Sequence, residues 1–157
     1  MSARDRSAGV LVEDAQILLM HRWRGEDEYF VVPGGGVEDG ETPEQACARE
    51  MLEEVNLSVE VGDLIREMPD GDRVQRFYRV TRTGGDMRLG DDPELQAGDP
   101  ENRYQPEWVP LSTLATMPVR PASILPTLLS LLWSQTDTDP KVLADLANAS
   151  DEAYQES

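Results

Sequence analysis

The chain has 157 residues, which is enough for one domain with its own hydrophobic core. Its 31 acidic and 14 basic residues give a net charge of −17, so binding to a nucleic-acid polymer is not expected. No apolar run approaches the roughly 18 residues of a membrane span, and a single cysteine cannot form an internal disulfide. These features predict a cytoplasmic protein without membrane contact, and we expect a monomer or a homodimer.

Short apolar runs bounded by turn residues alternate with two helical patterns along the chain. Strands are predicted over residues 7–12, 17–22, 29–32, 59–67, 73–81, 87–89 and 107–110. Helices are predicted over residues 42–55 and 121–135, and a polar loop over residues 90–106. Strands interrupted and followed by helices predict an α/β fold with a mixed sheet covered on both faces.

The chain divides into two parts by composition. Residues 1–135 contain all the predicted strands and both predicted helices, so we expect them to form the folded domain. Residues 136–157 carry six acids and one base. We expect this acidic tail to be mobile or to form a short helix.

The stretch over residues 34–57 combines a glycine turn with a well-specified helix. Thr42 is a typical N-cap residue, Pro43 suits the first helical position, and Gln45 completes a capping box. At 100° per residue the apolar side chains fall on one face of the helix: Ala48, Met51, Leu52 and Val55.

Three glutamates fall on the opposite face of this helix: Glu50, Glu53 and Glu54. They repel one another, and two of them lie in the last turn, where the helix dipole disfavours anions. A solvated acidic face is one interpretation. The other is a site for a hard divalent cation, which takes several oxygen ligands, with carbonyls of the glycine turn close by. Arg49 is placed to hold one of the carboxylates.

This stretch resembles the Nudix box. The family pattern is Gly, five residues, Glu, seven residues, Arg-Glu, an aliphatic residue, any residue, Glu-Glu, any residue, Gly and an aliphatic residue. The matching positions are Gly35, Glu41, Arg49, Glu50, Met51, Glu53, Glu54 and Leu57. Asn56 departs from the pattern, where the family has glycine, but asparagine is the next most tolerant of a left-handed conformation.

The resemblance implies the Nudix fold, an α/β/α sandwich with a mixed sheet between helices. It also implies hydrolysis of a nucleoside diphosphate linked to another group, by attack of water at phosphorus with Mg²⁺ or Mn²⁺. On this sequence the implied metal ligands are Glu50, Glu53 and Glu54, with the Gly35 carbonyl as a possible addition.

Other residues receive supporting or catalytic roles from the resemblance. Arg49 would orient a glutamate and Glu41 would support the loop, with Gly34, Gly36 and Asn56 as structural parts of the motif. The implied catalytic residues are Glu53, Glu54 and Arg49. Many relatives add a general base or further ligand from a late loop, for which Glu101 is the first candidate here and Glu94 the second.

The substrate is less well specified than the chemistry. The leading interpretation is a nucleoside triphosphate or a similar small nucleotide. The alternatives are ADP-ribose, a nucleotide sugar or a dinucleoside polyphosphate, and, in another class, a non-catalytic nucleotide-sensing module. Retention of all three box glutamates favours catalysis. Candidate substrate-binding residues are Arg22, Arg24 and Tyr78, whereas His21 and Cys47 are interpreted as structural.

Overall fold

The computed structural model describes residues 4–90 and 98–135, which form seven strands and two α-helices. The strands are β1 (Arg6–Glu13), β2 (Gln16–Arg24), β3 (Asp27–Val31), β4 (Gly34–Gly36), β5 (Ser58–Asp70), β6 (Arg73–Gly84) and β7 (Asn102–Pro110). The helices are α1 (Pro43–Val55) and α2 (Leu125–Gln135), with 3₁₀ turns η1 (Leu111–Thr116) and η2 (Ala122–Ile124). The predicted tail, residues 136–157, and Glu94 lie outside the described residues. Neither described helix is long and apolar enough to cross a membrane.

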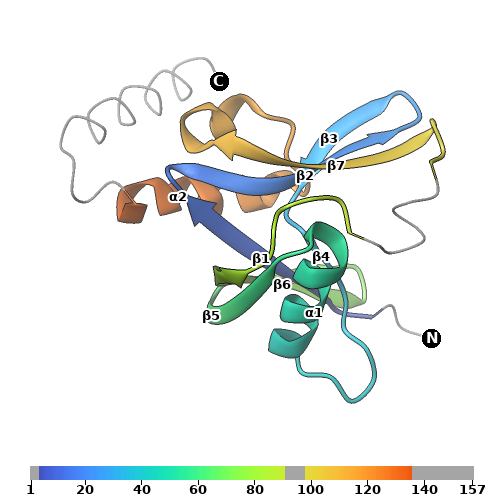
Figure 1. The fold of residues 1–157 in the computed structure, drawn as a ribbon, viewed down its shortest axis with the longest axis vertical. Helices are drawn as coiled ribbons and strands as arrows, with labels where there is room; N and C mark the ends of the chain where they lie inside the picture. The colour runs from blue at the N-terminus through green and yellow to red at the C-terminus, as the bar shows by residue number, and fades with distance from the viewer. Residues whose placement is uncertain (1–3, 91–97, 136–157) are drawn as a thin grey trace.

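Strand β1 is the centre of a mixed sheet. It pairs in parallel with β6 and antiparallel with β2 and β4, and the strand order is β3-β2-β1-β6-β5. Strand β7 pairs antiparallel with β2 along its whole length, from Arg24↔Asn102 to Gln16↔Pro110. In Figure 1, β2, β3 and β7 lie on one side of β1, and β4, β5 and β6 lie on the other side.

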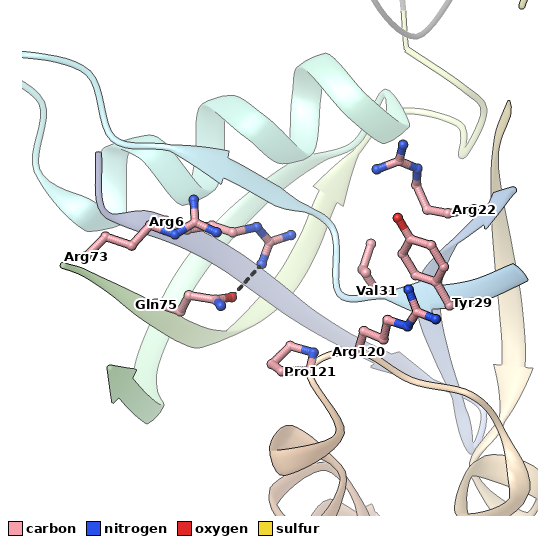
Figure 2. Close-up of a pocket in the computed structure, with 8 residues that line it drawn as sticks. All are labelled: Arg6, Arg22, Tyr29, Val31, Arg73, Gln75, Arg120 and Pro121. Carbon is pink, nitrogen blue, oxygen red and sulfur yellow. Dashed lines mark hydrogen bonds between the residues drawn. The ribbon is translucent and has the colours of Figure 1, made fainter. Parts of the chain in front are cut away.

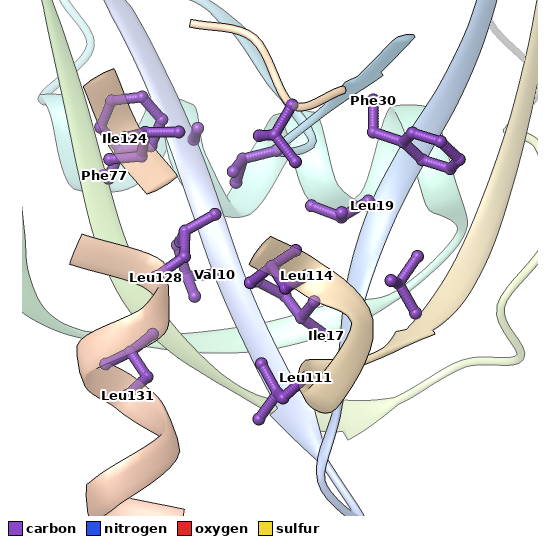
Figure 3. Packing of buried hydrophobic residues seen from close by; sticks show 14 of the residues in the cluster. Val10, Ile17, Leu19, Phe30, Phe77, Leu111, Leu114, Ile124, Leu128 and Leu131 are labelled. Atoms are coloured by element: carbon purple, nitrogen blue, oxygen red, sulfur yellow. The ribbon is translucent and has the colours of Figure 1, made fainter. Parts of the chain in front are cut away.

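Neighbouring residues on the central strands enter two different cores, because side chains alternate across a sheet. Val10, Leu19 and Phe77 pack toward α2 and η1, in the cluster drawn in Figure 3. Their chain neighbours Leu11, Leu18 and Tyr78 pack toward α1 on the other face. The sheet therefore lies between helices, as an α/β/α sandwich, and the predicted fold is confirmed.

The structure differs from the predicted elements at several places. The glycines 34–36 form β4, which local propensity disfavours. The strand exists because it pairs with β1 in the register Ala8↔Gly34, where a Cβ on Gly34 would lie 2.6 Å from the Ala8 Cα. Strand β7 begins at Asn102, five residues before the predicted start, since β2 offers a partner for its whole length. The strand predicted over residues 87–89 is wrong, because that segment has no strand partner.

The apolar face of α1 is also rotated from the prediction. Its buried residues are Ala46, Cys47, Met51 and Val55. Leu52 is 51% exposed instead of buried. This rotation follows the chain of i+4 contacts from Cys47 through Met51 to Val55, all of which pack on the sheet.

Candidate active site

Both ends of α1 are fixed by specific caps. The Thr42 hydroxyl accepts a hydrogen bond from the Gln45 backbone N–H at 3.1 Å, and the Gln45 side chain accepts from the Thr42 N–H at 2.9 Å. At the other end Asn56 adopts the left-handed conformation, with φ 60° and ψ 33°. Its side-chain amide donates to the Asp86 carbonyl at 2.9 Å, a contact that the family's glycine lacks. The helix that carries the glutamates therefore has a defined start and end.

Arg49 connects the glycine turn to the glutamates. Its Nε and Nη2 donate to the two oxygens of Glu41 at 2.8 and 3.0 Å, and Nη2 also donates to the Gly36 carbonyl at 2.9 Å. Its Nη1 donates to Glu50 Oε1 at 2.8 Å and to Glu53 Oε2 at 3.0 Å. One guanidinium thus contacts three carboxylates, which places Arg49 where it can orient two of the glutamates and Glu41 where it can support the loop.

The ion pair of Glu41 and Arg49 is stable near neutral pH. Arg49, together with the Glu38 backbone N–H, lowers the pKa of Glu41 to about 2. Glu41 and Glu50 in turn raise the pKa of Arg49 above its ordinary value. The pair therefore remains ionised through the whole physiological range.

Glu54 is half-buried and faces β4. Its Oε2 accepts a hydrogen bond from the Gly34 backbone N–H at 3.1 Å. Burial raises the pKa of Glu54 to about 8; the Arg6 guanidinium opposes this rise and the Glu50 carboxylate adds to it. A nearby cation would favour the charged form of this carboxyl.

The residues fit a divalent cation by their chemistry and by the space left at Gly35. Glutamate and carbonyl oxygens are the ligands that Mg²⁺ and Mn²⁺ prefer. A Cβ on Gly35 would lie 2.5 and 2.6 Å from the two oxygens of Glu50, so the absence of a side chain lets this carboxylate approach the turn. Among residues 4–90 and 98–135, no three acidic, histidine or cysteine side chains already converge on one point. Arg49 holds Glu50 and Glu53, and a bound cation would compete for these oxygens.

A pocket of about 290 Å³ opens beside this network (Figure 2). Its lining residues are Arg6, Arg22, Tyr29, Val31, Arg73, Gln75, Arg120 and Pro121. The Arg22 guanidinium stacks 3.9 Å from the centre of the Tyr104 ring and donates to Asn102 at 2.7 Å. Arg6 and Arg22 both interact electrostatically with Glu54, so the pocket adjoins the glutamates.

The structure brings together some of the predicted site residues and separates others. Arg22 lines the pocket, whereas Arg24 is exposed outside its lining. Tyr78 is 4% exposed, packs under α1, and donates its hydroxyl proton to Glu44, so it does not line this pocket either. Glu101 is exposed at the tip of the β2–β3 hairpin, where its carbonyl accepts from the Gly25 N–H at 2.8 Å.

The two residues interpreted as structural have surroundings that agree with that role. His21 stacks between Trp23 and Phe30, and its ring nitrogens lie 2.8 and 2.9 Å from Glu28 and Glu107. Cys47 is fully buried, and burial raises the pKa of its thiol to about 12.

Sequence reasoning did not single out three of the pocket arginines: Arg6, Arg73 and Arg120. They come from the start of β1, the start of β6 and the segment before η2. Arg120 reaches the pocket because residues 118–120 run along β3, where Phe30 N–H donates to Pro118 at 2.9 Å and Arg120 N–H donates to Phe30 at 2.8 Å. No local pattern connects these segments. The excess of arginine over lysine among the bases was the one available signal.

Comparisons with known proteins agree with this geometry. Residues 3–128 match the NUDIX domain model. The chain is 35% identical over 91 residues to an ADP-ribose pyrophosphatase of Methanocaldococcus jannaschii, a match that spans 54% of each chain. It is 34% identical over 110 residues to putative 8-oxo-dGTP diphosphatase 2 of Mycobacterium tuberculosis, spanning 66% of this chain and 78% of that protein.

Solved structures show the same fold at lower sequence identity. The solution structure of the E. coli ORF135 protein matches with a TM-score of 0.62 and 20% identity, over 89% of this chain and 96% of that one. A MutT structure, from a study of Aliivibrio salmonicida and Vibrio cholerae, matches with a TM-score of 0.65 and 20% identity, over 82% and 98% of the two chains. The domain match, the capped helix and its glutamates lead to one conclusion: the chain belongs to the Nudix hydrolase family.

Proposed function

We propose that this protein hydrolyses a diphosphate bond in a small nucleoside diphosphate derivative, with Mg²⁺ or Mn²⁺ as cofactor. The observation that carries this proposal is the Arg49 network, which holds Glu50 and Glu53 beside the half-buried Glu54 on one side of α1. The names of the two relatives, a pyrophosphatase and a diphosphatase, support the same class of reaction.

The glutamates and Arg49 have different tasks in the proposed reaction. Glu50, Glu53 and Glu54 would hold the cation, with the Gly35 carbonyl as a further ligand. A divalent cation bound there would neutralise the diphosphate and lower the pKa of the attacking water. Arg49 holds Glu50 and Glu53 close together, so these carboxylates need only exchange some Arg49 contacts for contacts to the cation.

The chemical step is a substitution at phosphorus. The water oxygen forms a bond to phosphorus, the bridging P–O bond breaks, and the bridging oxygen leaves with the electron pair. A carboxylate accepts the proton of the water. We propose Glu53 or Glu54 for this role, and Glu101, the residue before β7, as the alternative. Glu53, with a side chain 45% exposed, is open to solvent.

The preferred substrate within this class is a nucleoside triphosphate or a similar small nucleotide. ADP-ribose, a nucleotide sugar and a dinucleoside polyphosphate are the alternatives within the enzyme class. A non-catalytic nucleotide-sensing domain is the alternative outside it, and the intact carboxylate network counts against it. We further propose that the protein acts in the cytoplasm as a monomer or homodimer on free nucleotides.

The test is hydrolysis of a substrate panel by the purified chain with Mg²⁺ and with Mn²⁺. The panel contains canonical and oxidised nucleoside triphosphates, ADP-ribose, a nucleotide sugar and diadenosine tetraphosphate. We expect cation-dependent hydrolysis of one class, reduced at least about 100-fold in Glu53→Gln and unchanged in Glu60→Gln, an exposed glutamate on β5. Binding of a nucleotide by folded protein without hydrolysis in either cation would favour the sensing domain.

A further inference from the structure

The pocket beside the glutamates has a charge opposite to that of the chain. The whole protein has 31 acids, 14 bases and a net charge of −17. Of the eight residues that line this pocket, four are arginines and none is acidic. A random sample of this sequence would contain more acids than bases. Such a concentration of cations indicates an anionic ligand.

Two of these arginines have no carboxylate partner in the described part of the chain. Arg6 donates to the Val32 carbonyl at 2.7 Å and to Gln75 at 3.5 Å. Arg22 donates to Asn102, and its Nε is buried without a hydrogen-bond partner. A buried donor without an acceptor is unfavourable, and an anionic ligand in the pocket would supply an acceptor to the Arg22 Nε. Burial lowers the pKa of Arg6, which reflects the same lack of solvation.

The other two arginines each have a carboxylate nearby, Asp70 at 2.6 Å from Arg73 and Asp27 at 3.8 Å from Arg120. Arg120 also packs over the Tyr29 ring at 4.2 Å. Arg73 shares Asp70 with the side chain of Gln75. Figure 2 shows Arg6 and Arg73 at one end of the pocket, and Arg22 and Arg120 at the other end, where both approach the Tyr29 ring.

The pocket is adjacent to the proposed diphosphate site but separate from it. Arg6 lies on β1 opposite Gly36 of β4, and it interacts electrostatically with Glu54 and Glu50. Arg73 and Arg120 are further members of the same lining and make no ion pair with the box glutamates among the described residues. At about 290 Å³, the pocket is at the lower limit for a whole small ligand, so it suits one part of a larger molecule.

We propose that this arginine pocket binds a second phosphate group of the substrate, separate from the diphosphate that is cleaved. This proposal rests on the proposed function. A carboxylate is satisfied by one bidentate arginine, whereas a phosphate monoester has three strong acceptor oxygens and close to two negative charges, and suits several arginines at once. This proposal narrows the class of small nucleotides given above: it favours diphosphates that also carry a phosphate monoester over a simple nucleoside triphosphate.

The first test measures binding without turnover. The probes are adenosine 3′,5′-bisphosphate against AMP and guanosine 3′,5′-bisphosphate against GMP, none of which contains a diphosphate bond. In calorimetric titrations with Mg²⁺ we expect at least one bisphosphate to bind about tenfold or more tightly than its monophosphate. Arg73→Gln and Arg120→Gln should each reduce this preference at least about threefold.

The matched control is Arg82→Gln, which removes the same charge. Arg82 pairs with Glu13 at the far end of β1 from Arg6, a separation of about 23 Å for seven strand residues. The Arg82→Gln variant should prefer the bisphosphate over the monophosphate as strongly as the unmodified chain does. Circular dichroism checks that all three variants are folded.

The second test uses hydrolysis of coenzyme A and dephospho-coenzyme A, which differ by one phosphate monoester. Faster hydrolysis of coenzyme A, lost in Arg120→Gln, would support the proposal. Three results would overturn the proposal. They are equal affinity for bisphosphate and monophosphate in both pairs, no binding of either bisphosphate, and a loss of preference in Arg82→Gln as large as in Arg73→Gln and Arg120→Gln. Failure of the proposed function would look different from failure of this proposal. The protein would then still bind a bisphosphate more tightly than its monophosphate, but it would hydrolyse no diphosphate in either hydrolysis test.

Discussion

The variant Gly35→Ala should disturb the proposed cation site without unfolding the protein. In Gly35→Ala the new Cβ would lie 2.5 and 2.6 Å from the oxygens of Glu50. Ordinary contacts begin near 3.5 Å, so this carboxylate must move by about 1 Å. It is the end of a flexible side chain and can do so, but its 2.8 Å hydrogen bond from Arg49 would break.

The two consequences differ in size. Loss of one partly exposed charged hydrogen bond should cost about 1 kcal/mol, equivalent to about 2–4 °C in Tm for a chain of this length. A displacement of about 1 Å in a catalytic group can reduce kcat/KM about 100-fold. Gly35→Ala should therefore fold almost normally but lose most of its activity.

Two neighbouring glycines provide matched controls for this experiment. A Cβ on Gly36 meets only Arg4 atoms at 3.7 Å, so Gly36→Ala should change neither stability nor rate appreciably. A Cβ on Gly34 meets backbone atoms of β1, with the Ala8 Cα at 2.6 Å, so Gly34→Ala should cost about 1–3 kcal/mol or more. The assays are thermal unfolding with and without Mg²⁺, and kcat/KM on the substrate found in the panel. A normal Mg²⁺ response and rate in Gly35→Ala would refute this reasoning.

Three further predictions concern other parts of the site. In urea titrations, Asn56→Ala should lower the free energy of unfolding by about 1–2 kcal/mol, because alanine is strained in the left-handed conformation and the hydrogen bond to Asp86 is lost. The free energy of unfolding of Asn56→Gly should stay within about 0.5 kcal/mol of that of the unmodified chain, because the relief of backbone strain offsets the lost hydrogen bond. Arg49 lowers the folded-state pKa of Glu41 from 4.5 to about 2, so its stabilisation is complete above the unfolded pKa and is lost as the pH falls toward 2. The stability difference between the unmodified chain and Glu41→Gln should be about 1–2 kcal/mol at pH 7 and shrink below pH 4.5, and a constant difference would contradict it. Cys47 should react with a thiol reagent at pH 8 at least about 100-fold more slowly in the native chain than in urea, since its thiol is buried with a raised pKa, and equal rates would count against the described packing.

The box helix was predictable because its determinants are local. The capping box, Pro43 at the first turn and the spacing of the glutamates all lie within fifteen residues, and the structure reproduces the cap at both ends. The direction of individual side chains was less predictable. Side chains alternate along a strand, so Phe77 and Tyr78 lie on opposite faces of the sheet, and both are buried because helices pack on both sides.

Features that depend on distant segments could not be predicted from the sequence. Strand β4 forms because β1 lies beside it, and the length of β7 is set by β2. The arginine pocket is the clearest case, since it draws on the ends of β1, β2 and β6 and on the segment before η2. The four arginines of the pocket are far apart in the sequence, so no local spacing pattern predicts that they meet.

The central position of β1 has a consequence for how the chain folds during synthesis. Its parallel partner β6 follows 69 residues later, as in Arg6↔Gln75, and β2 reaches its partner β7 only with Gln16↔Pro110. At about 5–20 residues per second, the start of β1 waits roughly 3–14 s for its partner on β6. During this interval its apolar residues lack their final cover, and pairing with another nascent chain competes with folding. Residues 1–72, which are made before β6, carry 18 acids and 6 bases, a net charge of −12 that opposes such association. The acidity that the mature site must overcome to bind an anion would thus also protect the chain while it is being made.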